Sequence, residues 1–178
     1  MQAFSTNWLQ NYWFFELMGP LDYGILKQAC LNLVQHHSIL QTLFVHHGGE
    51  AFQIILRQLS IEVSTCETNG QAPLAFAEAY TRQDHLLQTF LGVPPVAFTL
   101  AKHTDSHHVL IIRLSHAQYD GLLISKLARD LFDVLHERPI SVPGDFVMYT
   151  EHVLQNHNTT AFDFWRNLLS GSSMTPFL

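Results

Sequence analysis

Cysteine and basic residues are both scarce in this chain of 178 residues. Its two cysteines, Cys30 and Cys66, are too few and too isolated for a disulfide scaffold or a Cys-x-x-Cys site, which fits a reducing compartment. Nine Lys and Arg against fifteen Asp and Glu give a formal net charge of −6. Nucleic-acid-binding proteins need basic stripes that displace counterions from phosphates, so we expect no nucleic-acid partner.

Charged residues as a whole are also few, at 13% of the chain against roughly 25% in an average soluble domain. Cover by another domain and ordinary variation both explain this, and composition does not separate them. The N-terminus lacks a basic segment followed by an apolar run, and Gln10, Asn11 and Glu16 interrupt its aromatic stretch. We therefore expect a cytoplasmic protein with neither a signal peptide nor a membrane span.

Histidine, in contrast, is abundant, with twelve residues. Three adjacent pairs raise the hypothesis of a metal site: His36-His37, His46-His47 and His107-His108. Adjacent side chains point to opposite faces of a strand and diverge by about 100° on a helix, so neither arrangement converges on one ion. Carboxylates and cysteines at ligand spacing are also missing nearby. We expect core and surface histidines and no metal site.

Strand and helix patterns alternate along the chain and predict an α/β fold. Strands are expected at residues 12–18, 40–45, 51–56, 61–65, 96–101 and 107–115, with Gly48-Gly49 turning a hairpin. Helices are expected after a cap at Asp22, at 73–85, 121–136, 146–156 and 161–169, before a linker at 170–176. The apolar run Val109–Leu114 predicts a strand buried on both faces, and an open sheet usually presents chemistry at such a strand end.

Directly after that strand come Ser115, His116, Asp120 and Gly121, and then a helix. An imidazole can take or give a proton near neutral pH. Asp120 can cap the helix, hold the loop, or both, and Gly121 leaves the amides of the helix start open to an anion or oxyanion. A loop histidine followed by a capping Asp-Gly is also common without catalysis. The residues alone leave both interpretations open.

The segment Ser115-His116-Ala117-Gln118-Tyr119-Asp120-Gly121 is similar to the HHxxxDG signature of nonribosomal peptide synthetase condensation domains, above all to the fungal form SHAxYDG. Residues 21–45 resemble the family's first helix and its RHxxLRTxF segment, and residues 109–114 resemble the strand before the signature. Residues 164–175 resemble the closing helix and the crossover of the first lobe. The resemblance implies an N-terminal lobe at residues 1–170 and the start of a crossover to a C-terminal lobe at 171–178.

The resemblance also implies a chloramphenicol-acetyltransferase-like lobe, with a mixed β-sheet flanked by helices, that pairs with the C-terminal lobe around a tunnel. Donor and acceptor peptidyl carrier proteins would deliver substrates on phosphopantetheine, and this lobe would bind no cofactor. The implied reaction forms an amide, an ester or a macrocycle from a carrier-bound thioester and an acceptor nucleophile. An isolated lobe should be inactive because half of the tunnel is missing.

By the same resemblance, His116 matches the catalytic histidine, which deprotonates or orients the acceptor. Asp120 matches the aspartate that holds the loop, and Gly121 matches the glycine that keeps the pantetheine path open. The remaining signature side chains are expected to contact substrate: Ser115, Gln118 and Tyr119.

Gln35 and Gln41 stand where the RHxxLRTxF segment has arginines. In the family the second arginine pairs with the signature aspartate. We therefore expect Asp120 to be held by Gln41 or by Arg113 instead.

Other functions stay open from the sequence. SHAxYDG is common in terminal fungal domains that release a product by cyclisation and in siderophore synthetases, so macrocyclisation stands beside elongation. A stand-alone acyltransferase that uses coenzyme A is built on the same fold. A non-catalytic lobe that only docks a carrier protein would explain the substitutions Gln35 and Gln41.

Overall fold

A computed structural model describes residues 10–87, 95–140, 144, 146–156 and 159–173. The chain divides into two compact units, Met1–Val142 and Pro143–Leu178. The first unit holds a four-stranded sheet in the order β1-β6-β5-β4. Its strands are β1 (Gln10–Met18), β4 (Val63–Glu67), β5 (Ala97–Thr104) and β6 (His107–Ser115).

The sheet is mixed, as predicted. β6 runs antiparallel to both of its neighbours, β1 and β5, while β5 and β4 are parallel. A parallel pair needs a crossover connection, and here α2 (Pro73–Leu87) lies in the segment between β4 and β5. The predicted α/β fold is therefore confirmed.

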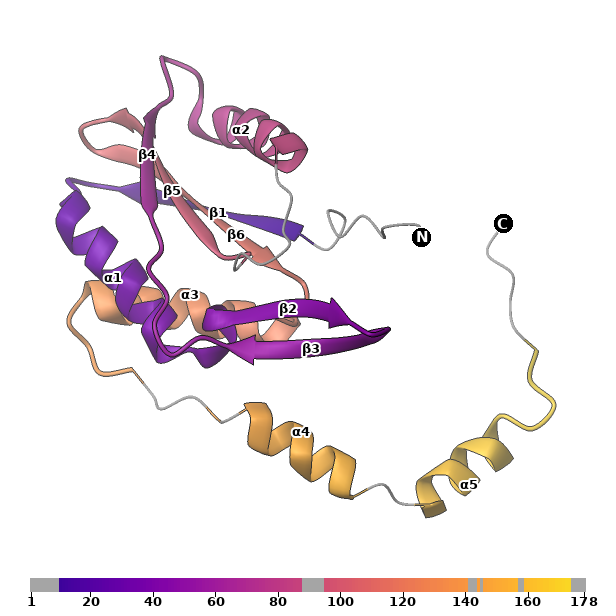
Figure 1. Ribbon diagram of the computed structural model, residues 1–178. Coiled ribbons are helices and arrows are strands. Elements are labelled where there is room, and N and C mark those ends of the chain that lie inside the picture. Colours follow the sequence, from indigo (N-terminus) through magenta and orange to yellow (C-terminus); the bar gives the residue numbers. More distant parts are fainter. Residues whose placement is uncertain (1–9, 88–94, 141–143, 145, 157–158, 174–178) are drawn as a thin grey trace. The chain divides into compact units, whose positions relative to one another are not determined.

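Helices cover both faces of this sheet (Figure 1). α1 (Tyr23–His36) and α3 (Gly121–Leu135) pack on one face, and α2 packs on the other. Side chains alternate along β6, so Leu110 and Ile112 join the core under α1 and α3, while Val109 and Ile111 join the core under α2. Residues 108–115 are all buried, which confirms the prediction of a strand covered on both faces.

The chain leaves α1 through a tight turn and a hairpin. Asp22 caps α1 by accepting a hydrogen bond from the amide of Ile25 at 3.1 Å, as predicted. A 3-10 turn, η2 (Ser38–Gln41), precedes the hairpin strands β2 (Thr42–His47) and β3 (Glu50–Ile55). Gly48 and Gly49 turn the hairpin with φ of 62° and 88°. The hairpin was expected from the sequence, and the 3-10 turn was not.

The second unit contains α4 (Phe146–Gln155) and α5 (Thr159–Leu168), close to the two helices expected there. Both expose large apolar side chains, including Met148, Phe164, Trp165 and Leu168. Residues 174–178, the end of the expected linker and crossover, lie outside the described residues. No described helix is long and apolar enough to cross a membrane.

Candidate functional site

The signature loop, residues 115–121, joins the end of β6 to the start of α3. β6 is an inner strand of the sheet, with β1 and β5 as its neighbours, so the loop begins at the end of an inner strand. The strand brings the loop to the surface, and the helix begins at its last residue. The predicted strand-to-helix corner is therefore present.

The imidazole of His116 is exposed in this chain. Its Nδ1 lies 3.0 Å from the carbonyl oxygen of Tyr119, and its ring stacks on the Tyr119 ring with centroids 4.9 Å apart and planes 10° from parallel. A carbonyl oxygen can only accept, so Nδ1 carries the hydrogen of the neutral ring. The other nitrogen of the neutral ring, Nε2, then carries a lone pair, and it has no hydrogen-bond partner among the described residues. This arrangement suits a general base.

Asp120 is the N-cap of α3. Its Oδ1 accepts hydrogen bonds from the amides of Leu122 at 3.0 Å and Leu123 at 2.8 Å. These are two of the first-turn amides that a helix start leaves unpaired. The predicted cap at Asp120 is confirmed. The expectation that these amides stay open for an oxyanion is wrong, because the carboxylate of Asp120 already occupies them.

Neither of its two predicted partners, Gln41 and Arg113, holds Asp120. Gln41 is buried, and its Nε2 donates to the carbonyl of Gln35 at 3.2 Å. Arg113 shares a face of β6 with Ile111, toward α2, whereas α3 covers the opposite face. The prediction that Gln41 or Arg113 holds Asp120 is wrong because the aspartate finds its partners locally, in its own helix.

Gly121 stands in open space. A Cβ added there would meet no heavy atom within 4 Å, and its backbone does not adopt the positive φ that favours glycine. Nothing in the described part of this chain therefore requires a glycine at this position. The expected role of Gly121, to keep a pantetheine path open, stays a prediction.

Ser115 and Gln118 close the loop on itself. The Gln118 amide donates to the Ser115 carbonyl at 2.8 Å, and the Ser115 amide donates to Oε1 of Gln118 at 3.2 Å. The Ser115 hydroxyl accepts from the Ala117 amide at 3.3 Å. Serine at the position of the family's first histidine thus acts as a turn former in this chain.

Gln118 is the most deeply buried side chain of the signature, with 1% of its surface exposed. Its Nε2 donates to the carbonyl of Ile39, in the turn η2, at 3.1 Å. Both ends of the carboxamide are therefore bonded to main-chain atoms. This burial argues against the predicted substrate contact and for a structural role. Tyr119 is half-buried, and its ring meets Trp13 edge-on with centroids 5.7 Å apart.

A buried hydrogen-bonded pair that the sequence did not reveal joins the residue before η2 to α3. Nε2 of His37 donates to Oδ2 of Asp130 at 2.8 Å, and Lys126 donates to the same oxygen at 2.8 Å. Only the Lys126–Asp130 spacing of four residues on a helix was a readable signal. Burial lowers the pKa of His37 below its ordinary value of 6.5, and Asp130 offsets this only in part.

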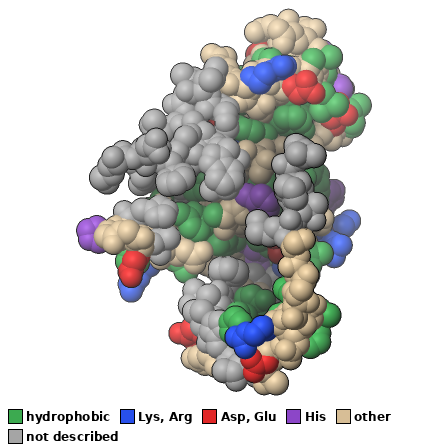
Figure 2. All heavy atoms as spheres, turned by 90° about the vertical axis from the view of Figure 1, so that its right-hand side faces the viewer, with side chains coloured by type: hydrophobic (Ala, Val, Ile, Leu, Met, Phe, Trp, Pro, Cys, Tyr) green, Lys and Arg blue, Asp and Glu red, His purple; other side chains and the backbone are tan. Residues whose placement is uncertain are grey.

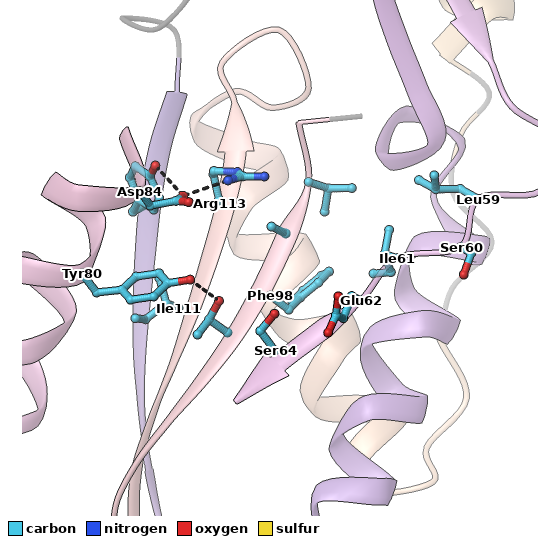
Figure 3. A pocket seen from close by; sticks show the side chains of 14 residues that line it. Leu59, Ser60, Ile61, Glu62, Ser64, Tyr80, Asp84, Phe98, Ile111 and Arg113 are labelled. Carbon is cyan, nitrogen blue, oxygen red and sulfur yellow. Dashed lines mark hydrogen bonds and ion pairs between the residues drawn. The ribbon is translucent and has the colours of Figure 1, made fainter. Parts of the chain in front are cut away.

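A cavity of about 290 Å³ is lined by α2, by the sheet strands and by the segment 59–64 (Figure 3). Its polar end holds Arg113, whose Nη1 lies 2.8 Å from Oδ2 of Asp84. Tyr12 donates to the same oxygen at 2.9 Å, and Nε of Arg113 donates to the Pro95 carbonyl at 3.1 Å. The predicted supporting role of Arg113 thus applies to the docking of α2 and not to the signature loop.

Within the part of the chain that the structure describes, no three His, Cys, Asp or Glu side chains are placed to hold a metal ion. On the face shown in Figure 2, the Lys and Arg side chains of the described residues form no continuous stripe. The signature loop is thus the site that the geometry favours.

Comparison with known proteins agrees with the signature. The family model described as "Condensation domain" matches residues 1–177. The chain is 35% identical over 164 residues to nonribosomal peptide synthetase fmqA of Aspergillus fumigatus, covering 92% of this chain and 4% of the synthetase. It is 35% identical over 171 residues to nonribosomal peptide synthetase apmB of Penicillium brevicompactum, covering 96% and 7%.

Solved structures share the fold. A crystal structure named CT aligns with a TM-score of 0.80 and 30% identity, covering 99% of this chain and 44% of that one. The starter condensation domain of rhizomide synthetase RzmA aligns with a TM-score of 0.78 and 16% identity, covering 96% and 44%. The chain thus spans less than half of these structures and a small fraction of the synthetases. It has the predicted chloramphenicol-acetyltransferase-like fold and belongs to the condensation domain family of nonribosomal peptide synthetases.

Proposed function

We propose that this chain is the N-terminal lobe of an active condensation domain, in which His116 is the general base for acyl transfer. The observation that carries the proposal is the exposed His116 ring, whose Nδ1 donates to the Tyr119 carbonyl and whose Nε2 is free. Residues 1–170 form this lobe, and residues 171–178 begin the crossover to a C-terminal lobe.

The chemistry follows from the free nitrogen. The nitrogen of an acceptor amine attacks the carbonyl carbon of the donor thioester, and its proton passes to Nε2 of His116. The carbon–sulfur bond then breaks, and the thiolate that leaves takes the proton back from the imidazolium. An amide has formed, a thiol has been released, and the histidine is regenerated. A hydroxyl acceptor would give an ester by the same steps, and an acceptor within the donor chain would give a macrocycle.

The partners follow from the same scheme. Donor and acceptor carrier proteins present their thioesters on phosphopantetheine arms, and the space around Gly121 supports a path for such an arm. The C-terminal lobe closes the tunnel. The similarity to synthetases of which this chain spans only 4% and 7% supports a multidomain setting over a stand-alone acyltransferase that uses coenzyme A.

The test is His116→Ala in the complete synthetase module, with carrier-bound product measured by mass spectrometry. A positioned base typically contributes about 10²- to 10⁴-fold, so product formation should fall by that factor while the module stays folded. His136→Ala is the matched control, because His136 is also exposed and its Nδ1 donates to a backbone carbonyl, that of Phe132, at 2.7 Å. The control should keep full activity.

Near-normal turnover in the His116→Ala module would remove the histidine from the mechanism. It would favour the alternative that this lobe docks a carrier protein without taking part in the chemistry.

A further inference from the structure

The carboxamide of Gln118 links two segments that are far apart in sequence. Its Nε2 reaches the carbonyl of Ile39, which lies 79 positions earlier in the chain, at 3.1 Å. Its Oε1 accepts from the Ser115 amide at 3.2 Å, at the point where β6 ends. The side chain is only 1% exposed. One buried side chain thus joins the end of a central strand to the turn η2.

These bonds enclose His116. Ser115 precedes the histidine, and Gln118 follows it by two residues and bonds back to Ser115 through both its main chain and its side chain. The next residue, Tyr119, supplies the carbonyl that receives Nδ1–H of His116. A shift of Gln118 would therefore move both the backbone that carries the imidazole and the acceptor that fixes its tautomer.

The anchor at Ile39 is itself fixed. Leu40, the next residue of η2, is buried at 1% exposure, and Thr42 donates its hydroxyl to the Ser38 carbonyl at 2.9 Å. His37, directly before the turn, bonds to Asp130 of α3 at 2.8 Å with both side chains buried. The turn is therefore tied to the core, to the hairpin and to α3, so it is a rigid reference for the loop.

We propose that Gln118 is a positioning residue for the catalytic reaction: it holds His116 at the angle and in the tautomer that present Nε2 to the acceptor. This inference rests on the proposed role of His116. The site demands a side chain with one acceptor and one donor at a fixed separation, and a carboxamide meets that demand. A carboxylate would keep the bond to Ser115 and place an acceptor against the Ile39 carbonyl.

The test compares Gln118→Met with the wild-type module. Methionine fills similar space and removes both bonds. We expect kcat to fall by about 10²-fold, the order of loss caused by a misplacement of about 1 Å, with KM for the acceptor little changed. Gln28→Met is the control, because Gln28 also makes a side-chain hydrogen bond, to Asn32, but on the exposed surface of α1. It should leave kcat unchanged.

A double-variant cycle separates positioning from simple damage. If Gln118 acts through His116, adding Gln118→Met to the His116→Ala module should cost little further activity. If Gln118→Met lowers activity in the His116→Ala background by the same factor as in the wild type, the inference is overturned. Full activity of Gln118→Met while His116→Ala is impaired would also overturn it. Full activity of His116→Ala would instead contradict the proposed function, in which His116 is the general base.

A second variant keeps the test decisive if methionine prevents folding. Gln118→Glu retains the size of the side chain and the bond to the Ser115 amide, but it replaces the donor that faces the Ile39 carbonyl with an acceptor, so the link to Ile39 is lost. We expect it to lower kcat by about 10-fold or more, and to lose this effect in the His116→Ala background. An unchanged kcat would show that the link to Ile39 has no positioning role.

Discussion

On the side of the sheet that carries α1, Gln118 of the signature loop buries a neutral carboxamide that is bonded to main-chain atoms. On the side that carries α2, the buried polar group is a charged one, the guanidinium of Arg113, bonded to the carboxylate of Asp84. The first arrangement fixes a loop, and the second fixes a helix on the sheet. We expect changes on the α1 side to appear in the rate of the reaction and changes on the α2 side to appear in stability.

The largest stability effect should come from Asp84→Ala. The Arg113 and Asp84 side chains are 9% and 15% exposed, and Tyr12 loses its acceptor at the same time. Removing one partner of a buried ion pair lowers the free energy of unfolding by about 3 kcal/mol. Urea denaturation of the condensation domain that contains this chain measures the loss.

Glu78→Ala is the control for that prediction. Glu78 faces Arg82 on the same helix at 4.0 Å, and both are exposed, so the change should cost less than about 0.5 kcal/mol. The Asp84→Ala variant should also keep its activity. At a temperature where the Asp84→Ala domain stays folded, the kcat of Asp84→Ala should equal that of the wild type. A large loss of kcat there would break the division between the two sides of the sheet.

A smaller effect should appear as a pH dependence of stability from His37. Burial depresses its folded-state pKa below 6.5, and His36 and Lys126 lower it further, against the opposing pull of Asp130. The unfolded chain therefore binds the proton more readily. Stability should be fully present above about pH 6.5 and should fall as pH decreases below it, by up to about 1.4 kcal/mol per pH unit.

His37→Gln isolates this contribution, since glutamine can still donate to Asp130 but does not titrate. Denaturation midpoints measured from pH 5 to 8 should show a shallower acid slope in the variant than in the wild type. Equal slopes would mean that His37 takes up no proton on unfolding.

A stability loss of about 1 kcal/mol should come from Asp120→Ala, which removes the cap of α3. Asp22→Ala removes the cap of α1 and should cost about the same, because both aspartates accept from first-turn amides. Only Asp120 lies in the signature loop, so only its loss should also lower kcat. Equal activity of the two variants in the complete module would reduce Asp120 to an ordinary helix cap.

Much of this fold could be predicted from local sequence pattern. The apolar run Val109–Leu114 had no polar face, and a strand without one must be covered on both sides. Gly48-Gly49 marked the hairpin because both residues adopt positive φ. The strand expected at 61–65 was found two residues later, as Val63–Glu67, because the sequence there alternates too weakly to fix its ends.

The bonds around the site could not be predicted in the same way. Gln118 meets Ile39 across 79 positions, and His37 meets Asp130 across 93. No periodicity reports such contacts, because they depend on how α1, η2 and α3 pack together. The apolar strand and the Asp-Gly helix start correctly placed His116 at a strand-to-helix corner. The resemblance suggested long-range partners for Asp120 where a local cap suffices.

The rate constant for a single turnover of carrier-bound donor and acceptor tests the central claim most directly, because it reports bond formation without product release. We expect a complete module with His116→Ala to lose about 10²-fold or more in this constant, while His136→Ala matches the wild type. Equal rate constants for all three modules would contradict a catalytic base at the end of β6.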